Sequence, residues 1–411
     1  SAGFLLQSSL SNMFDKPTLL EKDDAFLKRH RTFSQRCGSR RIWLTVAYIS
    51  DIINEKKRTG EYLFVRFSEK KEALAVTTEQ VSELLAQFPK VGLALNPTPL
   101  HPMQRLQQDL GCGPLFIKRD DLNGLGVGGN KIRNLEYLLG DALAQGKKTI
   151  LASGQTQSNL CSLCAAACCR LGLRCVLVHN SPPPKQLEGN ALLNHLLGAK
   201  EYYMGEASEE ERADFVEQLR VQLEQQGEEP YVIENGASSA RGALGYVEAA
   251  VEIARQIQQD SSLSSIQSVC IPAGNGGLAA GMIYGTALLG NPFHIELISV
   301  EHPLEQLRAI LLGFLQDLEE LCGVKMPCAL EETVTLHGGY RFGGWGKVEP
   351  ELEHFTLRFA QLEGIFVEKV YTVKTLYGVC DLAKQGYFPA GACYLHSGGL
   401  GALFSQYPEE R

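Results

Sequence analysis

Gly128-Gly129-Asn130-Lys131-Ile132-Arg133-Asn134-Leu135-Glu136 is the stretch that decides how the rest of the sequence is interpreted. It follows an apolar and basic run, residues 115–121, that predicts a strand ending in a turn. Apolar residues at helical spacing come after it and predict an amphipathic helix: Leu135, Leu138, Leu139, Ala142 and Leu143. Lys131 therefore lies at a glycine-rich junction between a strand and a helix, where backbone can approach a ligand closely.

An amine held at such a junction and shielded from water has a lowered pKa, which a lysine needs in order to form a Schiff base. The alternative is an ordinary surface lysine on a polar loop, and this is the more frequent fate of a single lysine. The motifs around Lys131 favour the first interpretation.

Three short motifs around this lysine resemble one enzyme family: Lys118-Arg119-Asp120-Asp121, Gly129-Asn130-Lys131 and Leu135-Glu136-Tyr137. The chain resembles the D-cysteine desulfhydrase and 1-aminocyclopropane-1-carboxylate deaminase family, pyridoxal-phosphate enzymes of the tryptophan-synthase-β type. The resemblance runs from Phe88 to Phe404 and leaves out the first part of the chain. It implies pyridoxal 5'-phosphate as the cofactor, bound covalently by Lys131.

Composition limits the classes of protein that fit this sequence. The chain has 411 residues, of which 44% are hydrophobic and 21% charged, as in ordinary globular proteins with two or three domains. The net charge of −8 argues against binding to nucleic acid or to an anionic membrane. No apolar run reaches the length of a membrane span. The 12 cysteines lack the spacing of a secreted disulfide framework, so we expect reduced thiols and a cytoplasmic protein.

Strands are predicted to alternate with helices through most of the chain. A strand over 149–152, a helix over 159–171 and a strand over 175–179 make one βαβ unit, and the alternation continues to the end. This pattern predicts an α/β fold with a mostly parallel sheet. The resemblance refines it to two open, twisted, mostly parallel sheets flanked by helices, known as fold type II of pyridoxal-phosphate enzymes. It also implies a homodimer.

By the same resemblance, residues 88–133 and 244–411 form a large cofactor-binding domain, and residues 134–243 form a small inserted α/β domain. Residues 1–87 are an N-terminal extension without an assigned chemistry. Within it, residues 22–41 are basic, residues 42–49 predict a strand or a buried helix turn, and Thr78 is the expected N-cap of a helix through Phe88. We expect a folded accessory segment rather than a transit peptide, because acidic residues interrupt the basic stretch.

The turn at residues 153–159 is a second candidate site. A helix beginning at Ser158 or Asn159 offers free backbone N–H groups and a positive dipole end to a carboxylate. Simple capping by Ser158 is the alternative. The resemblance implies that Ser158 binds the substrate carboxylate and assists catalysis, and that Asn159 contacts both the cofactor's phenolic oxygen and the substrate. Leu160 stands at a substrate position where the family usually has His or Gln, so one polar contact is missing.

Cysteines in the following helix invite a metal or redox interpretation. Cys161, Cys164 and Cys168 share one helical face among alanines, and no pair of histidines supplies further ligands. We therefore interpret them as small residues of helix packing and expect no metal.

A glycine-rich turn at residues 270–278 is the third candidate site. It lies between an apolar strand and a helix of small residues, where successive N–H groups can converge on a phosphate. The Rossmann and P-loop patterns both fail here, because a third glycine and a Gly-Lys-Ser/Thr sequence are lacking. The resemblance makes this turn the cofactor-phosphate site, with Ala273 and Leu278 standing where the family has hydroxyl residues. Its residues are Ala273, Gly274, Asn275, Gly276, Gly277 and Leu278.

The last third of the chain carries two further matches, Val370-Tyr371-Thr372-Val373-Lys374 and His396-Ser397-Gly398-Gly399. The resemblance implies that Tyr371 is catalytic near the substrate, that Thr372 meets the cofactor's pyridine nitrogen and that Ser397 contacts substrate. Deaminases of the family have Glu and Leu in place of Thr372 and Ser397, so both positions favour the desulfhydrase.

Trp345 aligns with the second active-site tyrosine of the family and is expected to contact substrate. An indole has no hydroxyl, so we expect any hydrogen bond or proton transfer through this side chain to be lost. Tyr340 is a possible replacement. Glu368-Lys369 also stands where the family usually has Asp-Pro.

Three functions remain open from the sequence. The first is a lyase that eliminates the thiol of D-cysteine, or a related group of another D-amino acid, to give pyruvate, ammonia and hydrogen sulfide. The second is an enzyme of the same fold with another substrate, including 1-aminocyclopropane-1-carboxylate. The third is a cofactor-binding pseudoenzyme with an interaction role, which the departures at Trp345 and Leu278 suggest.

Overall fold

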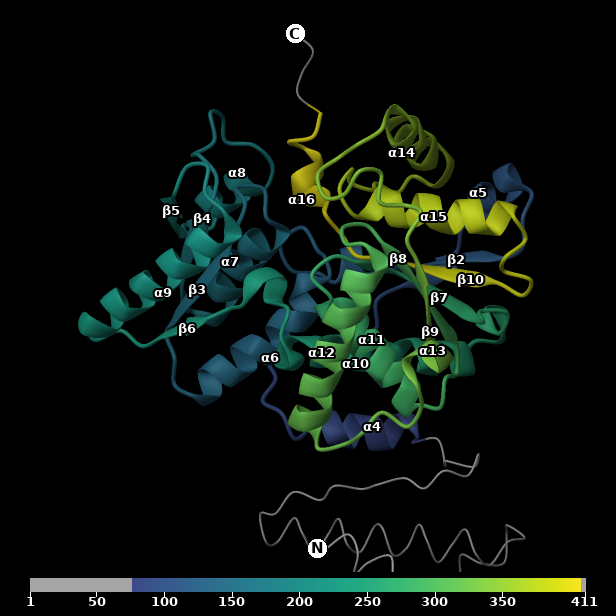
Figure 1. Cartoon of the computed structure of the whole chain (residues 1–411), viewed down its shortest axis with the longest axis horizontal. Coiled ribbons are helices and arrows are strands. Elements are labelled where there is room, and N and C mark those ends of the chain that lie inside the picture. Colours follow the sequence, from purple (N-terminus) through teal and green to yellow (C-terminus); the bar gives the residue numbers. More distant parts are fainter. Residues whose placement is uncertain (1–75, 408–411) are drawn as a thin grey trace, which may run out of the picture. The chain divides into compact units, whose positions relative to one another are not determined.

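A computed structural model of the chain describes residues 76–407. The predictions for residues 22–41 and 42–49 lie outside the described residues. Residues 76–407 belong to one compact unit with two sheets (Figure 1). The large sheet has six strands in the order β1 (Leu100–Pro102), β2 (Leu115–Arg119), β10 (Ala392–His396), β7 (Ser268–Ala273), β8 (His294–Ser299) and β9 (Val334–His337).

All pairings in the large sheet are parallel except that of β1 with β2. The small sheet has four parallel strands in the order β5 (Lys200–Tyr203), β4 (Arg174–His179), β3 (Thr149–Gly154) and β6 (Pro230–Val232). Two mostly parallel sheets with flanking helices confirm the predicted fold class.

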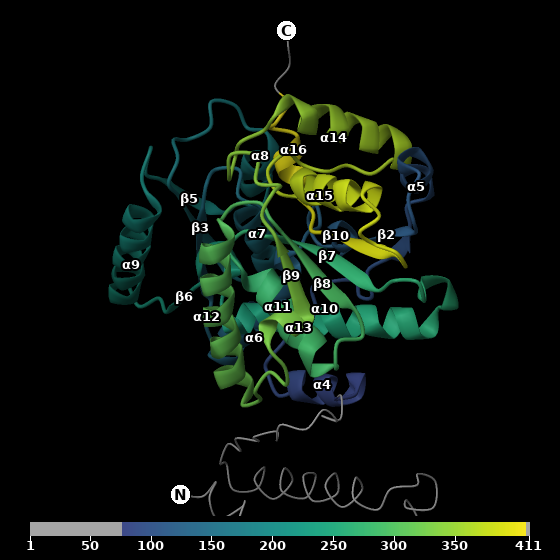
Figure 2. The same ribbon diagram turned by 45° about the vertical axis from the view of Figure 1, so that its right-hand side comes forward.

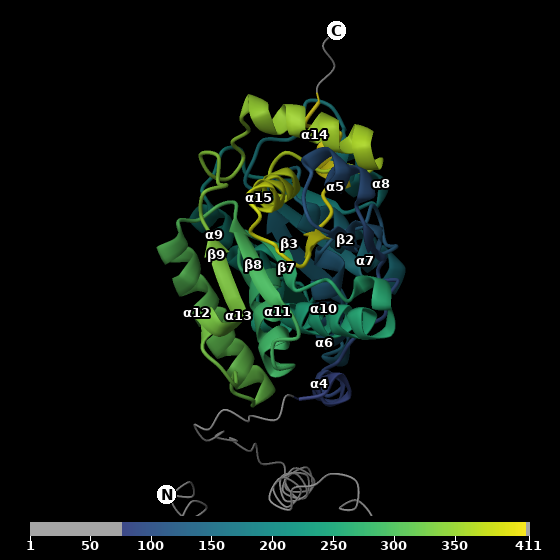
Figure 3. The same ribbon diagram turned by 90° about the vertical axis from the view of Figure 1, so that its right-hand side faces the viewer.

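Helices cover both faces of the large sheet, because its strand residues alternate between two apolar clusters. Phe116, Val269 and Ile271 face one cluster, which contains α10 (Ala240–Gln259), α11 (Gly277–Leu288) and α12 (Leu304–Cys322). Ile117 and Cys270 face the other, which contains α5 (Gln104–Leu110), α14 (Pro350–Glu363) and α15 (Thr372–Lys384). Figures 2 and 3 show α14 and α15 on one side of the strands and α10 and α11 on the other.

The small sheet is also covered on both faces. Ile150 and Leu177 pack with α7 (Asn159–Leu171), and α8 (Gly189–Leu196) lies against α7. Leu151 and Val176 pack instead with α9 (Glu209–Gln225). Helix α6 (Lys131–Ala144) connects the two parts of the fold and packs closely on α10. A Cβ atom on Gly245 would lie 2.2 Å from the carbonyl oxygen of Arg133, so this helix contact requires glycine.

Most predicted elements agree with the structure to within a few residues. Helix α7 has its predicted bounds, and β4 begins one residue earlier than predicted. The N-cap prediction at Thr78 is wrong. Thr77 caps α4 (Thr78–Leu85), because its hydroxyl accepts from the amide of Gln80 and the Gln80 side chain accepts from the amide of Thr77.

Helix α4 packs its buried residues Val81 and Leu85 into the cluster of α10, so the end of the predicted extension contacts the catalytic body. The remaining short elements are the helices α13 (Leu330–Thr333) and α16 (Leu400–Leu403), and the 3-10 turns η2 (Asp120–Leu122), η3 (Asn235–Ala237) and η4 (Ser261–Leu263). Between residues 76 and 407, no helix combines the length and the apolar character that crossing a membrane requires.

Candidate active site

Four parallel strands of the large sheet end at one edge and bring the predicted site segments together. β2 leads into the turn before Lys131, β7 into the glycine-rich turn, and β10 into Ser397; β8 leads to Glu301. Ligands of open α/β sheets bind at the carboxyl ends of strands. The strand order therefore brings together residues that are far apart in the sequence.

Lys131 is the first residue of α6, and its Nζ donates a hydrogen bond to the carbonyl of Gly236 at 2.8 Å. Burial of the amine lowers the pKa of Lys131 to about 8, while the carboxylate of Glu301 acts in the opposite direction. The amine is therefore partly neutral near physiological pH, as a nucleophile or proton acceptor requires. This agrees with the pKa direction expected from the sequence.

The turn before Lys131 is tightly packed. A Cβ atom on Gly128, whose φ is 75°, would lie 1.8 Å from the carbonyl oxygen of Asp121. The amide of Asn130 donates to the carbonyl of Ser397 at 2.8 Å, and the Asn123 side chain donates to the carbonyl of Gly129 at 2.8 Å. The structure thus places Ser397 next to the lysine turn. Asn123 was missed in the sequence, where it is one polar loop residue among several.

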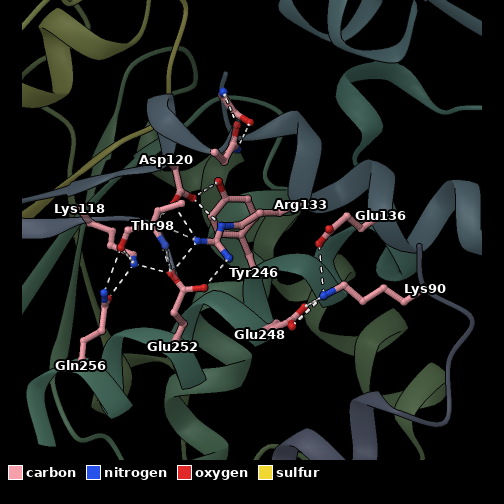
Figure 4. A network of polar contacts seen from close by, with 12 residues as sticks. Lys90, Thr98, Lys118, Asp120, Arg133, Glu136, Tyr246, Glu248, Glu252 and Gln256 are labelled. Atoms are coloured by element: carbon pink, nitrogen blue, oxygen red, sulfur yellow. Dashed lines mark hydrogen bonds and ion pairs between the residues drawn. The ribbon is translucent and has the colours of Figure 1, made fainter. Parts of the chain in front are cut away.

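A buried ionic network joins the strand that precedes this turn to the helix that follows it (Figure 4). Arg133 makes two hydrogen bonds of 2.8 Å with the carboxylate of Asp120, and two more with Glu252 on α10. Lys118 binds Glu252 and the carbonyl of Thr98. Burial alone would raise the pKa of Asp120, but the cations Arg133 and Lys118 hold that pKa at about 2. One of the motifs that carried the resemblance, residues 118–121, therefore supplies Lys118 and Asp120 to this network.

The glycine-rich turn has the shape of an anion cradle. β7 ends at Ala273, the turn contains Gly274, Asn275 and Gly276, and α11 begins at Gly277. Gly276 has a φ of 95°, and a Cβ there would lie 2.8 Å from Ile310. Gly276 and Gly277 add no side chains of their own at the N-terminus of α11, where first-turn N–H groups can bind an anion. Leu278 is buried in the first turn.

The glycine-rich turn is close to the partner of Lys131. A Cβ atom on Gly236 would lie 3.0 Å from the side chain of Asn275, and one on Gly277 would lie 3.0 Å from Ser238. The η3 turn thus links the lysine to the anion cradle. No role for this turn was predicted, although its run of small and turn-forming residues was a usable signal.

On the small domain, Ser158 caps α7, and its hydroxyl accepts from the amide of Cys161 at 3.3 Å. The amides of Asn159 and Leu160 have no acceptor within residues 76–407, so they are free for an anion. The Leu160 side chain packs in the apolar cluster of α7. Leu163, on the same helix, would be 3.3 Å from a Cβ on Gly129, which places α7 beside the lysine turn.

Asn159 has a partner that sequence analysis missed. The side-chain amide of Asn190, on α8, donates to Oδ1 of Asn159 and to the carbonyl of Gln157, each at 2.8 Å. The Oδ1 of Asn190 accepts from the hydroxyl of Ser162. These contacts fix the orientation of Asn159 and leave its NH₂ group available as a donor.

Tyr371 precedes α15 and lies against the glycine-rich turn, where its ring would be 3.1 Å from a Cβ on Gly274. Burial raises the pKa of its hydroxyl. Trp345 donates its indole Nε1–H to that hydroxyl at 2.5 Å. The expectation that Trp345 makes no hydrogen bond here is therefore wrong, because the indole nitrogen supplies a donor. Tyr340 does not replace it, since its hydroxyl binds Asp381.

A buried lysine holds the loop that carries Trp345. Lys374 is on the same helix as Thr372, is fully buried, and donates from Nζ to the carbonyls of Arg341 at 2.9 Å and of Gly344 at 2.6 Å. The loop contains backbone of positive φ at Phe342 and at Gly344. Lys374 thus offsets the cost of this irregular backbone with two charge-assisted hydrogen bonds.

The hydroxyl of Thr372 is engaged within the protein. It accepts from the amide of Glu368 at 2.7 Å and lies 3.1 Å from the Glu368 carbonyl. The buried carboxylate of Glu368 accepts from the amides of Val370, Tyr371 and Thr372 at 2.6–2.8 Å. Glu368, which departs from the family pattern, thus caps the start of α15 and fixes both site residues there.

Glu301 is an acidic residue of the site that no sequence motif indicated. One of its carboxylate oxygens is buried without a hydrogen-bond partner, and it would lie 3.0 Å from a Cβ on Gly274. Burial raises its pKa. Its position two residues after the end of β8 was the only available signal.

The residues at this edge fit a phosphorylated aldehyde cofactor. A buried, partly neutral amine lies close to a glycine-lined helix N-terminus, and an oriented asparagine lies on the neighbouring helix. Residues 91–398 match the model of the pyridoxal-phosphate dependent enzyme family. The chain belongs to this family. Its cofactor is pyridoxal phosphate, in agreement with the prediction.

Similar proteins carry two different names. The chain is 36% identical over 332 residues to D-cysteine desulfhydrase of Yersinia enterocolitica, which covers 79% of this chain and 98% of that protein. It is 35% identical over 325 residues to a protein of Pyrococcus horikoshii named for 1-aminocyclopropane-1-carboxylate deaminase, covering 79% and 96%. The solved structure of an ACC deaminase homologue matches with a TM-score of 0.73, 35% identity and coverage of 80% and 96%.

Proposed function

We propose that this enzyme catalyses the α,β-elimination of D-cysteine, or of a D-amino acid with a similarly good leaving group, to pyruvate, ammonia and hydrogen sulfide. The observation that carries the choice is Thr372 at the start of α15. Its hydroxyl is neutral and already bonded to Glu368. A neutral partner leaves the pyridine nitrogen unprotonated and the cofactor a weaker electron sink, which suits a substrate whose β-substituent leaves easily.

Each proposed role follows from a placement in the site. The free amides of α7, with Ser158, bind the substrate carboxylate. Lys131 binds the cofactor and takes the proton from Cα, because its lowered pKa provides a neutral amine. The carbonyl of Gly236, 2.8 Å from Nζ, orients that amine. The thiolate then leaves from Cβ and is protonated in water. Bound pyridoxal phosphate supplies the electron sink for the charge left at Cα.

The cofactor would be held from two sides. We assign its phosphate to the turn and first helical residues from Ala273 to Leu278, because the turn is a glycine-lined helix N-terminus. We assign its phenolic oxygen to the NH₂ of Asn159, whose carbonyl side is already bonded to Asn190. Trp345, Tyr371 and Ser397 are proposed to line the substrate side. The domain division, the homodimer and the cytoplasmic location stay predictions.

One observation favours the second candidate, opening of the cyclopropane ring. Glu301 directs a buried, unpartnered oxygen at the glycine-rich turn, beside Tyr371. A carboxylate there could supply the acidic group that position 372 lacks. Its raised pKa reduces the negative charge it contributes near neutral pH. For this reason D-cysteine elimination is our first choice. Nothing among the described residues favours the pseudoenzyme.

A substrate panel tests the proposal. Purified holoenzyme is assayed for pyruvate with D-cysteine, L-cysteine, β-chloro-D-alanine and D-serine, and for 2-oxobutyrate with 1-aminocyclopropane-1-carboxylate. We expect D-cysteine and β-chloro-D-alanine to be fastest, D-serine slower and the cyclopropane slowest. Faster cyclopropane opening, or a preference for L-cysteine, would overturn the assignment. Glu301→Gln serves as the matched variant: it should remove cyclopropane activity selectively if the second candidate is correct.

A further inference from the structure

Three cysteine thiols that the catalytic site does not use converge in the small domain. Cys164 and Cys168 lie one turn apart on α7, and Cys175 lies on β4, which α7 covers. Their sulfur atoms all lie within 4.8 Å of one another, and all three residues are buried. In the sequence, Cys164 and Cys168 share one helical face with Cys161, and no further ligand is apparent nearby. The strand residue Cys175 supplies the third sulfur.

The arrangement restricts the coordination number of any bound atom to three. Zinc in structural sites takes four ligands, usually cysteine and histidine. Within residues 76–407, this trio is the only group of three or more such side chains that converges to this extent, and it contains no histidine or carboxylate. The surrounding cluster is apolar, formed by leucines and alanines of α7 and by strand residues such as Ile150 and Leu177. A buried, apolar site with three sulfur ligands selects a soft element that three thiolates can coordinate fully.

The net charge of the complex further limits which element the three thiolates can bind. Three thiolates around a monovalent ion would bury two net negative charges, and around a divalent ion one. The carboxylate of Glu201 is close enough to Cys175 to raise the pKa of its thiol, and this carboxylate has the same sign of charge as a thiolate. An uncompensated charge in an apolar core is costly. Only a trivalent centre gives a neutral complex with three thiolates.

We propose that Cys164, Cys168 and Cys175 form a binding site for trivalent arsenic. Arsenous acid, As(OH)₃, condenses with three thiols to give As(SR)₃ and three molecules of water. Three As–O and three S–H bonds are replaced by three As–S and three O–H bonds, so the reaction needs no oxidant or reductant and leaves no net charge. The product cross-links α7 to β4.

The three-cysteine site lies on the same helix, α7, as the residues proposed to bind substrate. α7 begins with the residues proposed to bind the substrate carboxylate, and Leu163 contacts the lysine turn. A bond between α7 and β4 restricts local opening of the small domain and therefore stabilises the folded protein. Because the thiols are buried, uptake requires such an opening and is expected to be slow. The proposal does not depend on which amino acid is the substrate.

The test uses holoenzyme incubated with sodium arsenite and analysed by intact-protein mass spectrometry and X-ray absorption. We expect a mass increase of one arsenic atom less three hydrogen atoms, three sulfur neighbours around arsenic, and a rise in melting temperature. Cys168→Ala should weaken binding by about 10²-fold, because the third thiol acts at high effective concentration. Cys169→Ser is the matched control, since Cys169 is exposed on the same helix, and it should bind like the natural chain.

Separate Cys164→Ala and Cys175→Ala variants keep the test meaningful if one of them folds poorly. The melting temperature of each variant without arsenite reports folding, so loss of binding is judged only against a folded sample. Binding that persists in all three variants, arsenic with two sulfur and one oxygen neighbour, or no mass increase in the natural chain would each overturn the proposal.

Discussion

The indole nitrogen of Trp345 lies 2.5 Å from the hydroxyl oxygen of Tyr371 and donates a hydrogen bond to it. The indole N–H occupies a lone pair of the Tyr371 hydroxyl. The O–H proton of Tyr371 therefore points away from the indole. Tyr371 lies against the glycine-rich turn and close to Glu301. The tryptophan thus acts as a hydrogen-bond donor to Tyr371, although it cannot exchange a proton in the way that a hydroxyl can.

Trp345→Phe should lower kcat for the best substrate of the panel by roughly fivefold, because one hydrogen bond contributes about 1 kcal/mol. The measurement is a double-mutant cycle with Tyr371→Phe. If Trp345 acts through the Tyr371 hydroxyl, Trp345→Phe has little further effect once that hydroxyl is removed. Equal effects in both backgrounds would show that the indole acts on the substrate by its own contacts.

Lys374→Met should release the loop that carries Trp345, because two backbone carbonyls lose their buried cation. We expect a loss of about 1–3 kcal/mol in the free energy of unfolding, and a lower fluorescence anisotropy of Trp345, because the released loop lets the indole rotate more freely. The chain has two tryptophans, so the measurement uses a Trp43→Phe background. Lys384→Met, an exposed position on the same helix, is the control. An unchanged anisotropy would contradict the proposed role of Lys374.

The sequence indicated most of the fold because its signals are local. The boundaries of α7 follow from Ser158 as a cap and from helical spacing, and the turn before Lys131 follows from paired glycines. Local patterns also predicted parallel strands. The cap of α4 is Thr77, one residue before the predicted Thr78. The two successive threonines both have a side chain that can cap a helix, so the sequence alone does not distinguish them.

Contacts that depend on strand order could not be read from the sequence. Glu301 joins the site because β8 is the parallel neighbour of β7, and Asn190 orients Asn159 across a helix pair. Cys175 meets Cys164 only after α7 has folded over β4. The hydrogen bond of Trp345 was missed for a different reason: the indole was compared with a hydroxyl and its N–H was not counted as a donor.

The reactivity of Lys131 should depend on pH with a midpoint near its lowered pKa of about 8, rather than near the ordinary 10.5. The neutral amine is the reactive form, so the rate at which apoprotein binds pyridoxal phosphate covalently should rise as pH increases through this midpoint. Glu301→Gln removes a negative charge that raises the pKa of Lys131, so the midpoint should move to lower pH. Absorbance of the bound cofactor follows the reaction.

Glu305→Gln, at an exposed position on α12, is the control for Glu301→Gln and should leave the midpoint unchanged. The Lys131→Ala variant should form no covalent bond with pyridoxal phosphate, so borohydride reduction should leave no cofactor attached to it. A midpoint near 10 in the natural chain, or a label on Lys118 or Lys374 in peptide mapping, would contradict the assignment of Lys131.

Arg133→Met should be far more destabilising than removal of an exposed arginine. Arg133 is 1% exposed and pairs with both Asp120 and Glu252, so its loss leaves the buried carboxylate of Asp120 and the partly buried carboxylate of Glu252 without this partner. We expect a decrease of about 3–5 kcal/mol in the free energy of unfolding. Arg220→Met is the matched control. Arg220 pairs with Glu217 and Glu224 on the surface of α9, and its removal should lower the free energy of unfolding far less.

Urea unfolding at a fixed, saturating cofactor concentration measures both variants, because bound ligand adds to stability. Acid gives a second check on the same network. The folded pKa of Asp120, about 2, lies below its ordinary value of 3.8. Its stabilising effect is therefore fully present above pH 3.8 and is lost as pH falls through 2. The difference in the free energy of unfolding between the natural chain and Arg133→Met should therefore decrease as pH falls from 3.8 to 2. A difference that stays constant would show that the Arg133–Asp120 pair is not its source.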